Sequence, residues 1–171
     1  MKIFLIGFMG CGKTTMGKKF AAKQGFQLVD VDLEIERAAG STIAEYFSNH
    51  GEDEFRKLES DTLKNFPYAE NAVVATGGGS PCFFDNMDWM NANGVTIYIE
   101  LSPTALAKRL ESGMAKRPLL ANLSEQELIQ FIEKKLGERE EQYKKAQIIL
   151  SGINLNPADV QAALLAEGYH F

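Results

Sequence analysis

The sequence predicts an α/β fold, a three-layer sandwich in which a parallel sheet lies between two layers of helices. Five short apolar segments alternate with segments of helical pattern along most of the chain. This alternation is typical of a parallel sheet whose helical crossovers cover both of its faces. The chain has 171 residues, the size of one domain with one core, so we expect a single domain over residues 1–171.

The five expected strands are short runs of aliphatic and β-branched residues. They cover residues 3–6, 26–32, 72–76, 95–100 and 147–150. The first strand runs into a glycine, the second into two aspartates and the third into three glycines. Ligands of parallel α/β folds bind at the carboxyl ends of the strands, so we expect the functional site at this edge.

The expected helices are marked by apolar periodicity and by capping residues. They cover residues 13–24, 33–40, 43–51, 52–66, 103–110 and 124–145, and a last one starts at residue 157. Ser102 and Asn156 are suited to cap helices whose first position is a proline. The segment ESGMAKRPLL, residues 111–120, has no periodicity and is expected to form an exposed loop.

The composition excludes several classes of function. The formal net charge is −5, which argues against nucleic-acid binding as the main activity. No segment approaches the roughly 20 apolar residues of a membrane-spanning helix. Cys11 and Cys82 are the two cysteines, and they form neither a metal-binding pattern nor a disulfide framework. We therefore expect a cytoplasmic protein from a reducing compartment.

The segment GFMGCGKT matches the phosphate-binding pattern G-x-x-x-x-G-K-[ST] from Gly7 to Thr14. Its glycines allow several backbone N–H groups to converge on an anion, and the following helix adds its positive N-terminal end. In this pattern Lys13 reaches the β- and γ-phosphates and the Thr14 hydroxyl binds Mg²⁺. A glycine-rich turn with a surface lysine is the alternative. Cys11 is either a small space-filling residue or a thiol activated by the helix N-terminus.

Nucleotide binding does not by itself name a reaction. The guanine-reading pattern Asn-Lys-x-Asp of GTPases is missing from the sequence. A motor or a large ATPase would need a longer chain. A small chain with this loop and an irregular segment at residues 111–120 favours a kinase of a small molecule.

Asp30 and Asp32 stand two residues apart at the end of the expected second strand. On a strand, side chains with this spacing point to the same face. Two carboxylates so close need a cation or a hydrogen-bond donor, which a phosphoryl-transfer site supplies as Mg²⁺ and an acceptor hydroxyl. The alternative is a solvated strand end that leads into a helix N-terminus, where acids are favoured.

Three arginines and a glycine turn complete the candidate site, and each has a simpler explanation. Arg56 can form a surface ion pair with an acid three or four residues away, such as Glu52, Asp53 or Glu59. Arg117 can be a solvated loop charge, and Arg139 can lie on the solvated face of a long helix. The glycines at 77–79 can form a plain turn, or they can let a ligand approach the backbone closely.

Taken together, these segments carry a resemblance. GFMGCGKTT, DVDLEIE, GEDEFRKLE, TGGG and KRPLL follow one another, and an arginine then precedes a tyrosine. From about residue 3 to residue 157 the sequence resembles the shikimate kinase family. The resemblance implies a nucleoside monophosphate kinase-like fold with strand order 2-3-1-4-5. It also implies Mg²⁺-dependent transfer of the ATP γ-phosphoryl group to the 3-hydroxyl of shikimate, a step towards chorismate and the aromatic amino acids.

The resemblance further implies a role for each candidate residue. The expected catalytic residues are Lys13, Asp32, which orients the attacking hydroxyl or removes its proton, and Arg117 of a lid at about 111–122. The expected nucleotide contacts are Gly10, Cys11, Gly12, Lys13, Thr14, Thr15, Arg109, Arg117, Asn156 and Pro157. The expected substrate contacts are Asp32, Phe47, Phe55, Arg56, Gly77, Gly78, Gly79 and Arg139, several of them in a region of about 32–61. Thr14 and Asp30 would bind the metal.

The sequence departs from the family pattern at one position that bears on the nucleotide. Leu155 stands where some members carry a basic residue near the adenine. Two other functions remain as alternatives, a kinase of another small molecule such as gluconate and an ATP-binding module without catalysis. We expect a monomer with a small-molecule substrate and without nucleic-acid or membrane partners.

Overall fold

The computed structural model describes residues 1–112, 120 and 122–171. Its centre is a sheet of five parallel strands: β1 (Lys2–Ile6), β2 (Gln27–Asp30), β3 (Ala72–Ala75), β4 (Val95–Glu100) and β5 (Ile148–Ser151). The strand order is β2-β3-β1-β4-β5, which confirms the expected number, direction and order of the strands. The central strand β1 and its neighbour β3 are almost completely buried, as expected for strands covered on both faces.

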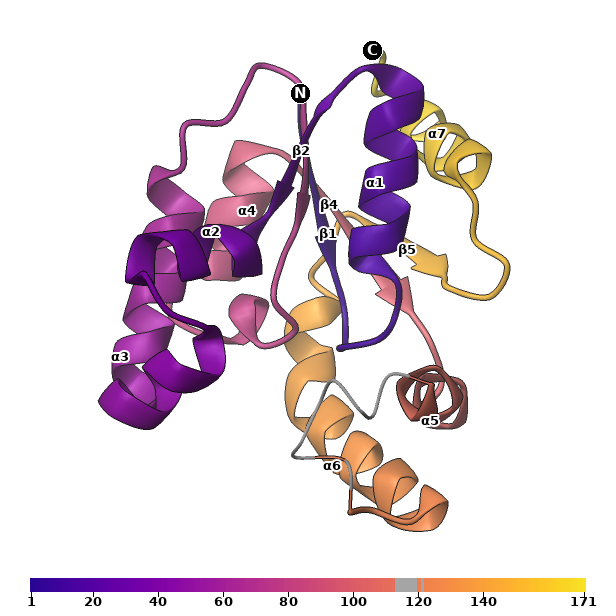
Figure 1. The fold of residues 1–171 in the computed structure, drawn as a ribbon. Helices are drawn as coiled ribbons and strands as arrows, with labels where there is room; N and C mark the ends of the chain where they lie inside the picture. The colour runs from indigo at the N-terminus through magenta and orange to yellow at the C-terminus, as the bar shows by residue number, and fades with distance from the viewer. Residues whose placement is uncertain (113–119, 121) are drawn as a thin grey trace.

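Helices cover the sheet on both sides (Figure 1). On one side lie α1 (Lys13–Gln24) and α7 (Pro157–Ala166), and on the other lie α3 (Ile43–Asn65) and α4 (Asn86–Asn93). The helix α2 (Val31–Ala39) packs against α3, and α5 (Pro103–Glu111) packs against α6 (Glu125–Tyr143). Among the residues that the structure describes, none of the helices is long and apolar enough to cross a membrane.

Two sequence predictions needed correction near the second strand. The strand expected over residues 26–32 ends at Asp30, and Val31 and Asp32 already belong to α2. The reason is a helix cap: the Asp30 carboxylate accepts a hydrogen bond from the Asp32 backbone N–H at 3.1 Å. Asp30 and Asp32 are therefore a cap and a first-turn residue, and the strand rule that predicted a common face does not apply to them.

The two helices expected at residues 43–51 and 52–66 form α3, which is kinked where the break was expected. Gly51 has non-helical angles, φ 82° and ψ 174°. The sequence analysis also missed α4 and the short 3-10 helix η1 (Ser80–Cys82), which link β3 to β4. Asp85 and the three asparagines of this segment hid its helical pattern.

Candidate active site

The phosphate-binding loop joins β1 to α1 at the carboxyl edge of the sheet. The Lys13 ammonium is almost buried and donates hydrogen bonds to the carbonyl oxygens of Gly7, at 2.7 Å, and Phe8, at 3.0 Å. Gly10 and Gly12 have positive φ angles, 82° and 102°. This conformation is the one expected of a loop that turns its backbone N–H groups towards an anion at a helix N-terminus.

Two cavities share this loop. The first, of about 280 Å³, is lined by Met9, Gly10, Gly12, Lys13, Thr14, Thr15, Asp30, Asp32, Thr76 and Gly78. The second, of about 270 Å³, is lined by Cys11, Gly12, Thr15, Met16, Lys19, Ile99, Arg109, Gly152, Asn154 and Leu155. Gly12 and Thr15 border both, so the two cavities adjoin across the start of α1. The cavities have different chemistry, because the two aspartates lie in the first and Arg109 lies in the second.

Arg109 connects two parts of the wall of the second cavity. Its guanidinium donates to the Cys11 carbonyl at 3.0 Å and to the Gly152 carbonyl at 2.9 Å. Leu155 lines this cavity, so the departure noted in the sequence falls on a cavity wall. Asn156 and Pro157 are not among the lining residues: the Asn156 side chain caps α7 by accepting from the Ala158 backbone N–H at 2.8 Å.

Asp30 and Asp32 both face the first cavity. The Thr14 hydroxyl donates to Asp30 at 3.2 Å, and the other carboxylate oxygen of Asp30 caps α2. The Asp32 side chain keeps contact with solvent, but the protein atoms around its carboxyl raise its pKa. The negative charge of Asp30 raises this pKa further, and the Lys13 ammonium opposes both effects.

The glycine turn that follows β3 collects charged side chains from three elements. A side chain at Gly77 would meet Glu59 and Asp32, because an added Cβ would lie 2.9 Å and 3.1 Å from their carboxylate oxygens. An added Cβ at Gly79 would lie 2.7 Å from both terminal nitrogens of Arg56. Residues without a Cβ are therefore required here for close packing of these groups.

Arg139 reaches the middle of the same turn from α6. An added Cβ at Gly78 would lie 3.5 Å from an Arg139 terminal nitrogen, and the guanidinium lies over the Phe8 ring at 5.7 Å. Tyr143, one helical turn further along α6, donates a hydrogen bond to the Gly78 carbonyl. Arg139 is thus turned towards the site, and the solvated helix face is not its environment.

Arg56 combines both explanations that the sequence allowed. Its guanidinium pairs with Glu59 at 2.8 Å and lies 3.7 Å from Glu52, so an ion pair does form. Only 11% of the Arg56 side chain is exposed, and Glu59 is buried. Burial raises the pKa of Glu59, and the neighbouring Arg56 charge opposes that rise. The ion pair is part of the site wall, next to the glycine turn.

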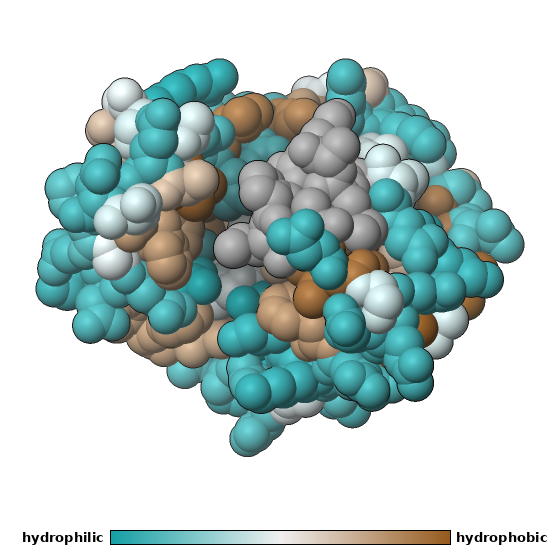
Figure 2. Space-filling model, turned by 60° about the horizontal axis from the view of Figure 1, so that its bottom comes forward, coloured by the Kyte–Doolittle hydropathy of each residue, from teal (hydrophilic) through white to brown (hydrophobic). Residues whose placement is uncertain are grey.

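Apolar side chains border the same region. Phe47 is 40% exposed and Phe55 is buried, and their rings lie 5.6 Å apart. Figure 2 looks onto this end of the molecule, where hydrophobic side chains border a depression in a largely hydrophilic face. Such a mixture suits a ring that carries polar substituents.

Several expectations and omissions remain to be placed. Arg117 and most of the expected lid at 111–122 lie outside the described residues. The sequence analysis treated Glu59 only as an ion-pair partner and did not single out Tyr143 as a site residue, although the spacing of Glu59 from Arg56 and of Tyr143 from Arg139 could have indicated both. The described residues contain no cluster of three His, Cys, Asp or Glu side chains that would hold a metal unaided.

The comparisons with known proteins agree with this geometry. Residues 9–167 match the family model described as shikimate kinase. A shikimate kinase from Phocaeicola vulgatus is 43% identical over 95% of this chain and 94% of its own length. One from Bacteroides thetaiotaomicron is 41% identical over 91% of this chain and 89% of its own.

Solved structures give the same result. A crystal structure of shikimate kinase from Bacteroides thetaiotaomicron has a TM-score of 0.91 and 38% identity, and it covers 99% of both chains. Shikimate kinase from Acinetobacter baumannii in complex with shikimate has a TM-score of 0.86 and 28% identity over 99% of this chain and 95% of its own. A gluconokinase from Sinorhizobium meliloti, with a TM-score of 0.54 and 16% identity over 96% of this chain and 89% of its own, shares the fold.

Proposed function

The chain belongs to the shikimate kinase family, and we propose that it transfers the γ-phosphoryl group of ATP to the 3-hydroxyl of shikimate. One observation carries the proposal: Asp32, Arg56 and Arg139 converge on one glycine turn beside the phosphate-binding loop. An acceptor with a carboxylate and several hydroxyls needs this combination, because arginines bind the carboxylate and an aspartate binds a hydroxyl.

We assign the ATP phosphates to the loop and to the first cavity. Lys13 has its ammonium next to the loop carbonyls, from where it can reach the β- and γ-phosphates. The second cavity suits the nucleoside, with Arg109 as one wall and Leu155 as another. Asn156 and Pro157 would then support this wall from the start of α7, because Leu155 directly precedes the cap.

Thr14 and Asp30 fit a magnesium ion. Both offer oxygen atoms, which Mg²⁺ prefers, and they already lie within hydrogen-bond distance of each other. A magnesium ion there would neutralise charge on the phosphates. With two protein oxygens, the remaining ligands would be phosphate oxygens and water, as is usual for Mg²⁺ in kinases.

Asp32 is our candidate for the group that acts on the attacking hydroxyl. It lies in the same cavity as Lys13, so a hydroxyl bound to its carboxylate would be near the phosphates. A raised pKa makes the carboxylate a better proton acceptor than an ordinary aspartate. We propose that Asp32 binds and orients this hydroxyl, and both orientation alone and proton removal agree with the position.

The two arginines are suited to bind the carboxylate of shikimate. Arg56 approaches the glycine turn from α3 and Arg139 approaches it from α6, so they flank one region from two directions. Guanidinium groups can pair with a planar carboxylate through two parallel hydrogen bonds, which a lysine cannot do. Phe47 and Phe55 would contact the ring, and the N–H groups of Gly77, Gly78 and Gly79 would donate to the substrate.

The rest of the proposal rests on the resemblance. We propose that Arg117, from a lid at about 111–122, stabilises charge on the transferred group, and that 1–171 is one domain. We also propose a monomer in the cytoplasm. Both cysteines are free, as is usual in a reducing compartment.

A coupled assay of ADP release tests the reaction directly. The protein is given ATP and Mg²⁺ with shikimate, with gluconate, or without an acceptor. We expect release that depends on shikimate. Release with gluconate instead would leave the phosphate-binding assignment intact and remove the role of the two arginines. Tight ATP binding without release in any arm would support the non-catalytic module.

A further inference from the structure

The ring of Phe83 covers the guanidinium of Arg56. The central carbon of the guanidinium lies over this ring at 4.1 Å from the centroid, closer than over Phe55, where the distance is 5.1 Å. We infer that Phe83 is a positioning residue that fixes the plane of the Arg56 guanidinium for binding the substrate carboxylate. This inference rests on the proposed function, because it gives Arg56 the task of binding a carboxylate.

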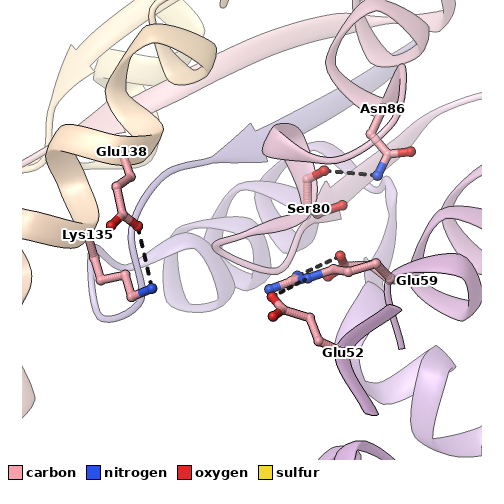
Figure 3. Close-up of polar contacts among 7 residues, drawn as sticks. Glu52, Glu59, Ser80, Asn86, Lys135 and Glu138 are labelled. Atoms are coloured by element: carbon pink, nitrogen blue, oxygen red, sulfur yellow. Dashed lines mark hydrogen bonds and ion pairs between the residues drawn. The ribbon is translucent and has the colours of Figure 1, made fainter. Parts of the chain in front are cut away.

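The ion pairs of Arg56 are not sufficient to orient it. One terminal nitrogen pairs with Glu59 at 2.8 Å, whereas Glu52 lies at 3.7 Å from the Nε atom, too far for a hydrogen bond. The Nε atom is buried and has no hydrogen-bond partner among the residues that the structure describes. A guanidinium held at one nitrogen can still rotate, and a second constraint on its plane would prevent this. Figure 3 shows both glutamates pointing towards the guanidinium from α3.

The Phe83 ring and the Gly79 backbone supply this second constraint. Both terminal nitrogens of Arg56 pack against Gly79, and the Phe83 ring lies against the guanidinium. A cation is attracted to the face of an aromatic ring, and the attraction grows when water is excluded. The Arg56 side chain is largely buried, so the desolvated case applies.

A buried polar network holds the segment that carries Phe83, and Figure 3 shows one of its hydrogen bonds, between Ser80 and Asn86. The Asn86 side chain is fully buried, and its amide donates to the Ser80 carbonyl at 2.9 Å. The Ser60 hydroxyl donates to the other end of the same amide at 2.7 Å. In the sequence Phe83 stands between Ser80 and Asn86, and its backbone carbonyl accepts a hydrogen bond from the Asn86 backbone N–H at 3.2 Å.

The network also connects the segment that carries Phe83 to α3, through the hydrogen bond between Ser60 and Asn86. Ser60 and Arg56 are four residues apart on this helix, so they lie on the same side of it. The helix that carries Arg56 therefore also anchors the loop whose phenylalanine covers Arg56. Movement of α3 would carry both partners, which keeps the stacked pair together.

The test compares two substitutions at Phe83 with one at its neighbour. Phe83→Leu removes the aromatic face and keeps an apolar side chain, while Phe83→Tyr keeps the face. Phe84→Leu is the matched control, because Phe84 is the next residue and its side chain is 64% exposed. For each variant, kcat and the KM values for shikimate and for ATP are measured in the coupled assay.

We expect Phe83→Leu to raise the KM for shikimate by about 3- to 30-fold, from the usual strength of such contacts. Its KM for ATP should stay within about twofold, because the nucleotide cavity is elsewhere. Phe83→Tyr should restore most of the shikimate affinity, and Phe84→Leu should resemble the wild type.

Three results would overturn the inference while leaving the proposed function in place. Phe83→Leu could match Phe84→Leu, it could raise both KM values equally, or Phe83→Tyr could fail as badly as the leucine variant. The first would deny a role for the ring, the second would show a general structural effect, and the third would show packing without an aromatic contribution.

A wild-type protein inactive on shikimate would instead overturn the proposed function. If Phe83→Leu fails to fold, the comparison of Phe83→Tyr with Phe84→Leu still decides: loss of shikimate affinity in the tyrosine variant alone contradicts the inference.

Discussion

The phosphate-binding loop and the glycine turn after β3, the two regions to which we assign anion binding, are built in different ways. The loop is one continuous stretch from Gly7 to Thr14, and the partners of Lys13 are carbonyls of the same stretch. The glycine turn is surrounded by side chains that come from α2, α3 and α6. The loop is therefore specified locally, while the glycine turn depends on the whole fold to bring its charges together.

The two regions also differ in how their charged groups are compensated. The buried ammonium of Lys13 is satisfied by carbonyl oxygens. Around the turn, burial raises the pKa of Glu59, while the pKa of Asp32, whose side chain keeps contact with solvent, is raised by the protein atoms around its carboxyl and by the charge of Asp30. The assembled region thus keeps its carboxylates in surroundings that disfavour their charge, which is common where a protein binds or transforms a substrate.

The largest expected effect comes from Asp32→Asn, which separates the two regions most sharply. The variant cannot accept a proton or hold a hydroxyl through a charged oxygen, so kcat should fall by about 10²–10⁴-fold. ATP binding, measured by calorimetry, should be retained, because the loop carbonyls and not this carboxylate hold Lys13 in place. Turnover close to that of the wild type would remove Asp32 from the mechanism.

The next effect tests the close packing at the turn. Gly79→Ala places a Cβ about where the Arg56 guanidinium lies, at 2.7 Å from both of its terminal nitrogens. The guanidinium is the end of a flexible side chain, so it can move aside with little loss of folding stability. We expect the KM for shikimate to rise by about tenfold or more, as for a lost charged contact, while the unfolding midpoint in urea changes little.

Gly137→Ala is the matched control for this substitution. Gly137 lies in α6, and an added Cβ there would meet no atom of the described part of the chain within 4 Å. This variant should keep its kinetics and gain about 0.5–1 kcal/mol of stability from its helix propensity. If Gly79→Ala bound shikimate as well as Gly137→Ala does, Arg56 would not need its present position.

A smaller effect is expected from Tyr143→Phe, which loosens the link between α6 and the turn. The substitution keeps the ring, which lies 5.1 Å from that of Tyr98, and removes the hydrogen bond to the Gly78 carbonyl. The loss should lower the free energy of unfolding by about 0.5–1.5 kcal/mol. The KM for shikimate should rise a few-fold, because Arg139 shares the helix, and the KM for ATP should not change. Equal changes in both KM values would show that Tyr143 only stabilises the fold.

The same division explains what the sequence could predict. Gly7 to Thr14 and the five strands were readable because each is a local pattern with its own spacing. The position of Asp32 in the cavity was predicted by a strand rule that does not hold, since Asp30 caps a helix there. Helical spacing could have indicated Glu59 and Tyr143 as neighbours of Arg56 and Arg139, but the contact of Phe83 with Arg56 depends on how α3 and the segment after β3 pack together.

The smallest expected effect concerns Glu59 and the pH dependence of stability. Its folded pKa is raised above the ordinary value of 4.5, so the folded protein holds this proton more tightly than the unfolded chain. The stability that the proton contributes is present below pH 4.5 and is lost as the pH rises through the folded pKa. Glu59→Gln does not titrate, so the stability of the wild type relative to this variant should fall as the pH rises from 4 towards neutrality.

Urea denaturation at several pH values measures this trend. The control is Glu54→Gln, which changes an exposed ion pair with Lys57 and is expected to alter the stability little. The opposite trend would mean that the Arg56 charge outweighs burial, and the glycine turn would then resemble the phosphate-binding loop in having its charges fully compensated.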